Sequence, residues 1–167
     1  MRYNMLGMNA LQLSNKLSRG FSVGELLVVV AVVTLIAALS ATSFVNLNKT
    51  QVIDKTALLA LSVLDEARSL TLASKNSLQY GVHFEDSKVV LFTGTAYSSG
   101  DSTNQVNLLN TAAKTLTISL AGGGSEVIFD RLTGATSQNG SVTFSLRSDS
   151  NTTKTITVYT TGTAQSN

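Results

Sequence analysis

The sequence predicts an α+β protein in which a long N-terminal helix packs on an antiparallel β-sheet. Two observations predict the helix. An apolar run extends from Leu26 to Val45, and after it a stripe of apolar residues recurs at every third or fourth position. A third observation predicts the sheet, because beyond Asn76 apolar and polar residues alternate with the period of a strand. A length of 167 residues allows one ordinary domain besides the apolar run.

The apolar run has the length of a membrane span. A helix rises about 1.5 Å per residue, so roughly 20 apolar residues cross a bilayer core of about 30 Å. Basic residues precede the run at Arg2, Lys16 and Arg19, and such residues hold their end of a span in the cytoplasm. The sequence therefore predicts a single-pass protein of the inner (cytoplasmic) membrane, with its globular domain outside the cytoplasm.

The basic character of the chain belongs to residues 1–20. The whole sequence has 12 basic and 10 acidic residues and a pI near 9.0. Residues 1–20 hold three of the basic residues and no acid, so the remainder has nine basic and 10 acidic side chains, a net charge of −1. This balance argues against a nucleic-acid partner. The absence of cysteine excludes both a disulfide framework and a thiolate metal site.

One acid, Glu25, stands at the start of the apolar run, and no other charge occurs from Leu26 to Asn48. A carboxylate at the centre of a bilayer costs about 2.5–3.5 kcal/mol on insertion scales, so such residues tend to be paired and functional. If the chain were cut after Gly20, Phe21 would carry a free amine. The amine of one subunit would then meet Glu25 of a neighbour in an assembly, offsetting the cost and setting the register between subunits.

The pattern Gly20-Phe21-x-x-x-Glu25, followed by the apolar run, resembles the class III signal of type IV prepilins and type II secretion pseudopilins. The resemblance implies that a prepilin peptidase cleaves between Gly20 and Phe21 and N-methylates Phe21. It also implies an inner-membrane assembly platform and other pilin or pseudopilin subunits as partners. One residue departs from the pattern: Thr42 stands where relatives often carry proline, and the chain has no proline to kink a helix.

The rest of the chain is expected to fold as a globular pilin-like domain, residues 46–167, after a leader at 1–20 and a transmembrane or filament-core helix at 21–45. A helix is predicted over about 52–74, with a break allowed at 46–50. Its expected buried stripe is Val52, Thr56, Leu59, Val63, Ala67 and Leu70, widened by Leu58, Leu61 and Leu72, and Asp65 is expected to pair with Arg68. Strands are predicted at 78–84, 88–92, 106–109, 115–120, 127–129, 141–146 and 154–159, with 78–84/88–92 and 141–146/154–159 forming hairpins.

The order of helix and strands is similar to the GspH/FimT branch of pseudopilins and minor pilins, and residues 64–92 resemble the late helix and first hairpin of that branch. Some members of the branch bind DNA and carry a glycine followed by arginines near the C-terminus. Here Gly162 is followed by no basic residue, and the remaining bases are scattered among acids. Phosphate contacts depend mainly on Lys and Arg, so this argues against DNA binding.

Other candidate chemistry is weak, and no catalytic residue, cofactor or metal ligand is expected. His83, the single histidine, lies on a predicted strand and is expected to face solvent or a loop. Asp101 and Asn104 lie in a polar loop without the repeated acids that calcium requires. Three glycines at 122–124 lack the Lys-Ser/Thr and the helix start of a phosphate-binding loop.

The sequence thus favours a non-enzymatic structural subunit, a minor pilin or pseudopilin, of a type IV pilus or a type II secretion fibre. One alternative is a secreted or membrane-anchored β-rich adhesin-like domain with an ordinary signal peptide, cut within the small residues at 38–41. A second alternative is a minor pilin that binds DNA for uptake.

Overall fold

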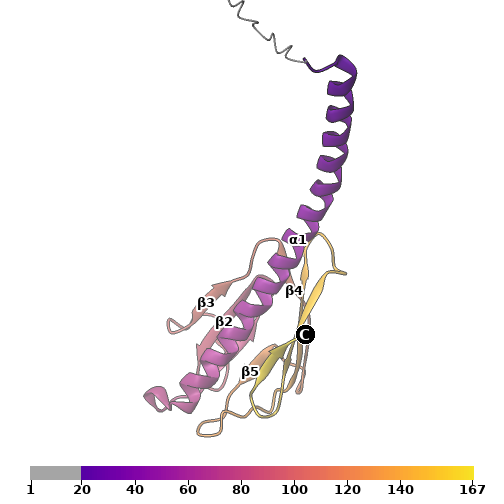
Figure 1. Cartoon of the computed structure of the whole chain (residues 1–167). Helices are drawn as coiled ribbons and strands as arrows, with labels where there is room; N and C mark the ends of the chain where they lie inside the picture. Colours follow the sequence, from indigo (N-terminus) through magenta and orange to yellow (C-terminus); the bar gives the residue numbers. More distant parts are fainter. Residues whose placement is uncertain (1–19) are drawn as a thin grey trace, which may run out of the picture. The chain divides into compact units, whose positions relative to one another are not determined.

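The computed structural model describes residues 20–167, apart from the side chains of residues 41–46 and of Lys75. The predicted leader therefore lies outside the described residues except for Gly20. The α+β class is confirmed, with two antiparallel sheets in place of the single expected sheet (Figure 1). The elements in chain order are α1 (Val23–Leu72), the 3-10 helix η1 (Lys75–Ser77), β1 (Tyr80–Phe84), β2 (Lys88–Thr93), β3 (Gln105–Leu108), β4 (Ala113–Leu120), β5 (Glu126–Ile128), β6 (Gly140–Leu146), β7 (Thr153–Val158) and β8 (Ala164–Ser166).

Helix α1 covers residues 46–50, where the sequence allowed a break, and it includes Thr42 within its bounds. It ends at Leu72, close to the predicted end at residue 74. Three residues just beyond, Ser74, Asn76 and Ser77, have φ angles of 47°, 55° and 58°. A right-handed helix cannot continue through such left-handed conformations, which is how many helices stop. The chain divides into two compact units, and the second begins at Thr42.

The buried side of α1 in the second unit is built around small residues. Ala57, Ala60 and Ala67 are fully buried and lie on one side of the helix with Ile53 and Leu64. Alanines let a helix approach its neighbours closely, because little side chain separates the backbones. The predicted stripe is correct at Thr56, Val63 and Ala67, which are buried, whereas Val52, Leu59 and Leu70 are only half-buried.

Two leucines expected to widen the stripe do not belong to it. Leu58 is 59% exposed and Leu72 is 39% exposed, whereas Leu61 is partly buried against the core. Successive helical residues are about 100° apart, so Leu58 lies on the opposite side of the helix from Ala60. The prediction for Leu58 and Leu72 was wrong because the alanine-lined buried face is narrower than a leucine-rich one.

The eight strands form two four-stranded antiparallel sheets. The first has the order β3-β2-β1-β5 and the second the order β4-β6-β7-β8. Both predicted hairpins are confirmed, β1 with β2 and β6 with β7. All seven predicted strands are present, and the structure adds β8, whose residues Ala164–Ser166 give no alternating apolar signal.

One hydrophobic core contains side chains of α1 and of both sheets, and Figure 1 shows the later part of α1 running alongside the strands. Val82 of β1 lies opposite Leu91 of β2 and Val127 of β5, and all three side chains are buried. From the second sheet the core takes Leu120, Val142, Phe144, Ile156 and Val158.

The C-terminal segment contacts both α1 and the loop before β6, at Thr161 and Gly162. This glycine has a φ of +75°, and a Cβ added to it would overlap the carbonyl oxygen of Gly134. Arg68 of α1 donates hydrogen bonds from Nε to the Gly134 carbonyl at 3.2 Å and from Nη2 to the Thr161 carbonyl at 3.4 Å. Among the described residues no ion pair joins Arg68 to Asp65, so the expected pair is replaced by these longer-range bonds.

This contact predicts that Gly162→Ala destabilises the domain strongly. The left-handed conformation costs a non-glycine residue about 1–2 kcal/mol, and forcing a methyl group into the backbone of Gly134 adds about 1–3 kcal/mol. Gly122→Ala is the matched control, because Gly122 has a φ of +89° but open space around its Cβ position. Urea unfolding of the full chain in detergent, followed by tyrosine fluorescence, should show the larger loss for Gly162→Ala. Equal losses for the two variants would contradict the close contact.

Candidate functional site

The first turn of α1 brings together the residues that the sequence singles out. Gly20, Phe21 and Ser22 lie before the helix in a non-helical, exposed conformation, and Glu25 lies in the first turn. Ser22 is the N-cap: its Oγ accepts a hydrogen bond from the Gly24 backbone N–H at 3.3 Å, and its carbonyl accepts from the Leu26 N–H at 3.1 Å. Serine is among the preferred residues at this position.

The cap adds a reason for an acid at position 25 that the sequence reasoning missed. Ser22 and Glu25 have the spacing of a capping box, Ser-x-x-Glu, and this pattern was readable in the sequence. An acid in the first turn also interacts favourably with the positive end of the helix, which contributes about 0.3–1 kcal/mol. The helix start therefore depends on Ser22 as well as on Glu25.

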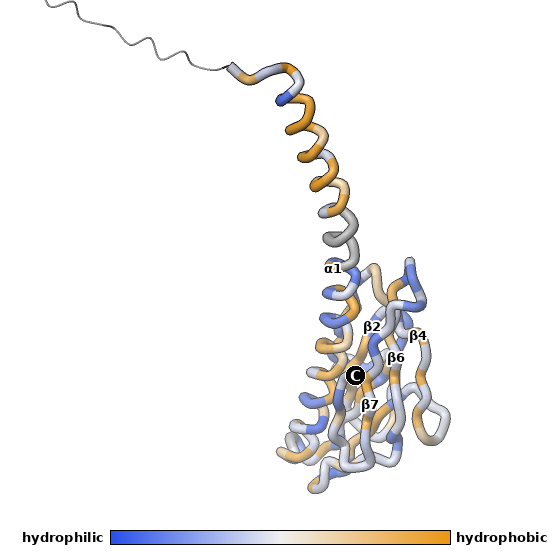
Figure 2. The backbone as a smooth tube through the Cα atoms, turned by 45° about the vertical axis from the view of Figure 1, so that its right-hand side comes forward, coloured by the Kyte–Doolittle hydropathy of each residue, from blue (hydrophilic) through white to orange (hydrophobic). Residues whose placement is uncertain are grey.

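Helix α1 has one segment that is long and apolar enough to cross a membrane, Val23–Ser40, with a mean hydropathy of 2.5 and no buried residue. Figure 2 shows this segment as the almost continuous hydrophobic part of the tube. By length and composition the segment fits a membrane span, and it fits a signal sequence equally well. Its two hydroxyl side chains bond to the helix itself: Thr34 donates to the Ala31 carbonyl and Ser40 to the Ile36 carbonyl.

His83 of β1 lies under the loop between β2 and β3. The sequence predicted that it would face either solvent or a loop. The ring of Tyr97, from that loop, stacks on the imidazole with a centroid distance of 3.9 Å and an interplanar angle of 13°. Two carboxylates flank the imidazole: Glu126 lies 3.6 Å from Nδ1 and Glu85 lies 3.9 Å from Nε2. The Ser125 hydroxyl also lies near Nδ1, at 3.5 Å.

This arrangement differs from a nucleophile–base–acid relay. A relay needs the acid on one ring nitrogen and the nucleophile on the other. Here Ser125 and Glu126 both approach Nδ1, and Nε2 faces a second carboxylate, that of Glu85. The residues instead fasten the loop, because the Tyr97 N–H donates to Glu126 at 3.2 Å and the Tyr97 hydroxyl donates to Glu85 at 3.1 Å.

Tyr97 also covers the side of the first sheet that faces away from the main core. Its ring meets Phe92 edge-on at a centroid distance of 5.7 Å. Phe92 and Val90 are buried although neither belongs to the main core. Burial raises the pKa of the Tyr97 phenol above its ordinary value of 10.0, and the hydrogen bond to Glu85 raises it further.

The loop residues Asp101 and Asn104 are used in local hydrogen bonds. The Asp101 carboxylate accepts from the backbone N–H and from the hydroxyl of Thr103, both at 2.8 Å. These bonds lower the pKa of Asp101 below its ordinary value. In the part of the chain that the structure describes, no group of three or more His, Cys, Asp or Glu side chains has the geometry to hold a metal ion.

The glycine run 122–124 forms the turn that leads from β4 towards β5. Gly122 and Gly123 have φ angles of +89° and +71°, which a turn of this kind requires. The run borders an open groove of about 220 Å³ with Glu126, Ile128 and Gln138. A strand and not a helix follows it, so the turn does not offer the helix start of a phosphate-binding loop.

Three of the basic side chains weighed against DNA binding are paired with acids. Lys88 lies 3.2 Å from Glu85, Lys154 lies 3.4 Å from Asp54, and Arg147 pairs with Asp86. A paired base is less available to a phosphate, since the acid repels the nucleic acid and competes for the same donor. These pairs favour a structural surface over a phosphate-binding one.

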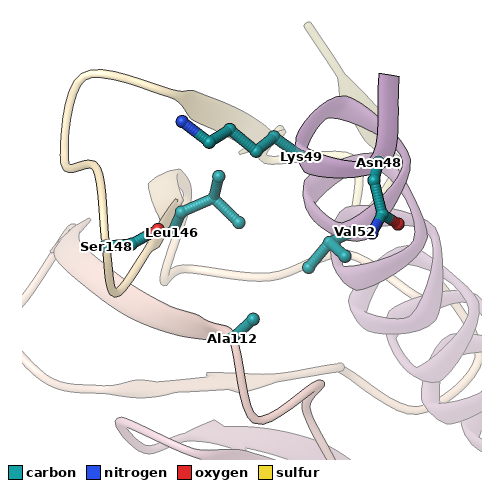
Figure 3. A pocket seen from close by; sticks show the side chains of 6 residues that line it. All are labelled: Asn48, Lys49, Val52, Ala112, Leu146 and Ser148. Carbon is teal, nitrogen blue, oxygen red and sulfur yellow. The ribbon is translucent and has the colours of Figure 1, made fainter. Parts of the chain in front are cut away.

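A second groove, of about 200 Å³, lies between α1 and the hairpin of β6 and β7 (Figure 3). In Figure 3 Lys49 extends from α1 towards the loop that holds Ser148, and Leu146 and Val52 line the interior. The next loop residue, Asp149, accepts hydrogen bonds from the Thr152 hydroxyl and the Asn151 N–H. These bonds lower its pKa, and the charge of Lys49 adds to the effect.

The Tyr97 contacts predict a measurable alkaline titration. Because the folded state raises the phenol pKa, the unfolded chain ionises first, at about 10. The stabilisation is therefore complete below pH 10 and is lost as the pH rises through the higher folded-state value. An ultraviolet difference titration of wild type against Tyr97→Phe should give a midpoint above 10.0, and Glu85→Gln should move it downwards. A midpoint at or below 10.0 would contradict the contact with Glu85.

Comparisons with known proteins give no match: no family model, no curated protein and no solved structure matches this chain.

Proposed function

We propose that the chain is a non-enzymatic structural subunit, a minor pilin or pseudopilin, of a type IV pilus or a type II secretion fibre. The observation that carries the proposal is the first turn of α1. An exposed Gly20–Phe21 peptide bond is followed by a capped helix with one acid, Glu25, and then by an apolar segment, Val23–Ser40, of which no residue is buried. Cleavage at that bond, methylation of Phe21, insertion in the inner membrane and transfer into a fibre follow from the resemblance to prepilins.

The surroundings of Gly20 support access by a prepilin peptidase. A peptide bond must be extended and open to enter a peptidase, and Gly20 and Phe21 precede the helix, with Phe21 79% exposed. Apart from Gly20 itself and its two chain neighbours, no atom lies within 4 Å of the position that a Cβ on Gly20 would take. A larger residue therefore fits this position within the chain itself, so any effect on cleavage would come from the peptidase.

The energetics of Glu25 support a partner outside the chain. In the described residues its carboxylate has no ion pair. The helix end contributes about 0.3–1 kcal/mol, whereas an acid in a membrane helix costs up to about 2.5–3.5 kcal/mol, the value at the bilayer centre, and less near an interface. A cation from a neighbouring subunit would make up the difference. The free amine of Phe21 in the cleaved neighbour is the cation that the resemblance supplies.

The second unit supports the pilin-like arrangement of one amphipathic helix section against sheets. Buried residues of α1, among them Ala60 and Leu64, share their core with both sheets. In the proposed fibre the segment at 21–45 packs helix-on-helix in the interior, and the β-rich domain forms the outer surface.

Processing is the first test. The intact mass of the mature protein should correspond to a chain that starts at N-methyl-Phe21, because the peptidase cuts after Gly20. Gly20→Leu should leave the longer precursor in the membrane with its domain folded. A mature start near Ala41 or Thr42 would support the ordinary signal peptide and sink the pilin proposal, as would an uncut wild-type chain.

Assembly is the second test. Glu25→Leu and the near-isosteric Glu25→Gln should both be processed and stay in the membrane, yet be lost from sheared fibres by about tenfold or more, equivalent to about 1.4 kcal/mol per subunit contact. Asp130→Asn is the control, because Asp130 is an exposed acid of the domain. If both Glu25 variants entered fibres as wild type does, the proposed role of the carboxylate would be wrong.

A further inference from the structure

The exposed side of α1 in the second unit carries a narrow face that points away from the core. Its residues recur at three- and four-residue steps and are all exposed; we call them the outer face, and they are Leu47, Gln51, Lys55, Leu58, Ser62, Glu66 and Ser69. At about 100° per residue they fall within roughly 100° of one another. Ala60 and Leu64 of the buried face lie on the opposite side of the same helix.

The outer face carries charges that the chain does not use. Two charged residues close to this face have partners within the domain: Asp54 pairs with Lys154, and Arg68 bonds to two carbonyls. Lys55 and Glu66 have no ion pair or side-chain hydrogen bond in the described part of the chain. They are 11 residues apart, about 16 Å along the helix axis, so they cannot reach each other within one molecule.

The two leucines of the outer face are separated by the same number of residues as Lys55 and Glu66. Leu47 and Leu58 are also 11 residues apart, and each is 59% exposed. Eleven residues make about three turns, so residues with this spacing lie nearly one above the other. A parallel second copy displaced by 11 residues would place its Lys55 beside Glu66, and its Leu47 beside Leu58.

The surroundings of Leu58 offer space for such a contact. An open groove of about 280 Å³ lies between α1 and the C-terminal strands, lined by Asp54, Leu58, Lys154 and Ser166. Leu58 forms one wall of the groove and belongs to the outer face. An apolar side chain from a second copy would be partly removed from water beside Leu58, which is favourable in proportion to the apolar area buried.

We propose that the outer face is a contact between parallel copies of this chain, displaced by 11 residues or about 16 Å. The occupant is a second copy because one displacement satisfies two independent pairs, one of opposite charge and one apolar. The parallel orientation rests on the proposed function, in which every copy enters the membrane through the same N-terminal segment. Lys55 and Glu66 then set the displacement between these two copies, which differ from the pair joined by Phe21 and Glu25, because opposite charges favour a displacement of 11 residues over nearby values.

The absence of cysteine from the whole chain makes the contact testable by disulfide cross-linking without background. Two differently tagged full-length versions, Leu47→Cys and Leu58→Cys, are expressed together in the native host and oxidised in membranes and sheared fibres. A mixed dimer is expected, since these positions face each other while all charges stay in place. Ser62→Cys alone is the control: its copies would be about 16 Å apart in the parallel contact but within about 5 Å in an antiparallel pair centred between Lys55 and Glu66.

Charge reversal tests the register. In the background of the two cysteine variants, Lys55→Glu should lower the yield of mixed dimer by about two- to fivefold, the range expected for an exposed ion pair. Adding Glu66→Lys to the same chain restores opposite charges and should recover the yield. Failure of the double variant to recover would overturn the role of the charges.

Two readouts separate this inference from the proposed function. Chains that start at N-methyl-Phe21 and enter fibres, but give no dimer between Leu47→Cys and Leu58→Cys, would overturn the inference and leave the proposed function standing. A dimer of Ser62→Cys with itself would overturn the parallel contact in favour of an antiparallel one. Uncut chains that enter no fibre would overturn the proposed function, and this inference with it.

Discussion

The apolar side chains between Phe21 and Leu39 need a non-aqueous environment that the rest of the described chain does not supply. Twelve large apolar residues of this segment are between 51% and 79% exposed. Fully burying one such side chain contributes about 1.5–3 kcal/mol, so burying the exposed part of all twelve, somewhat over half of each, is worth on the order of 10–20 kcal/mol. This equals or exceeds the whole stability of a typical domain, about 5–15 kcal/mol. It also exceeds the cost of about 2.5–3.5 kcal/mol for an acid at the centre of a bilayer.

The second unit, in contrast to the exposed apolar segment, buries most of its own large apolar side chains. Ala57, Ala60 and Ala67 bring the helix backbone close to the strands, and the phenylalanines Phe84, Phe129 and Phe144 fill the remaining space. The charged residues that stay on the outside of α1 are arranged sparsely, with Lys55 and Glu66 well separated. A single helix thus has one segment that is apolar on nearly all sides and another that is buried on one side only.

Most of the secondary structure was predictable, because seven of the eight strands carry a local signal in the sequence. Alternating apolar residues predicted β1, β2, β6 and β7 and their pairing into two hairpins. The strand β8 was missed because Ala164–Ser166 has no large apolar residue and is held by backbone bonds to β7. The prediction that Leu58 is buried was wrong because a leucine-rich helix has several faces that could be buried. Which face is buried depends on strands that lie far away in the sequence.

The candidate site residues were likewise predictable only where they lie close together in the sequence. Gly20, Phe21 and Glu25 lie within six residues, so their spacing alone defines the pattern, and the cap at Ser22 was readable there too. The surroundings of His83 were not readable, since Tyr97 and Glu126 come from a loop and a strand 14 and 43 residues further along the chain. Stacking between such residues depends on the sheet order β2-β1-β5, which local patterns do not contain.

The bonds of Arg68 have a consequence for the order in which the domain is completed. Its guanidinium reaches carbonyls 66 and 93 residues later in the chain, at Gly134 and Thr161. The end of α1 near Arg68 therefore cannot make these bonds until nearly the whole polypeptide has been synthesised. Contacts of such large sequence separation slow folding, because the chain between them must be ordered first. The close contact of Gly162 with Gly134 forms late, and a chain truncated before Thr161 would leave Arg68 without its Thr161 partner and the second sheet without β8.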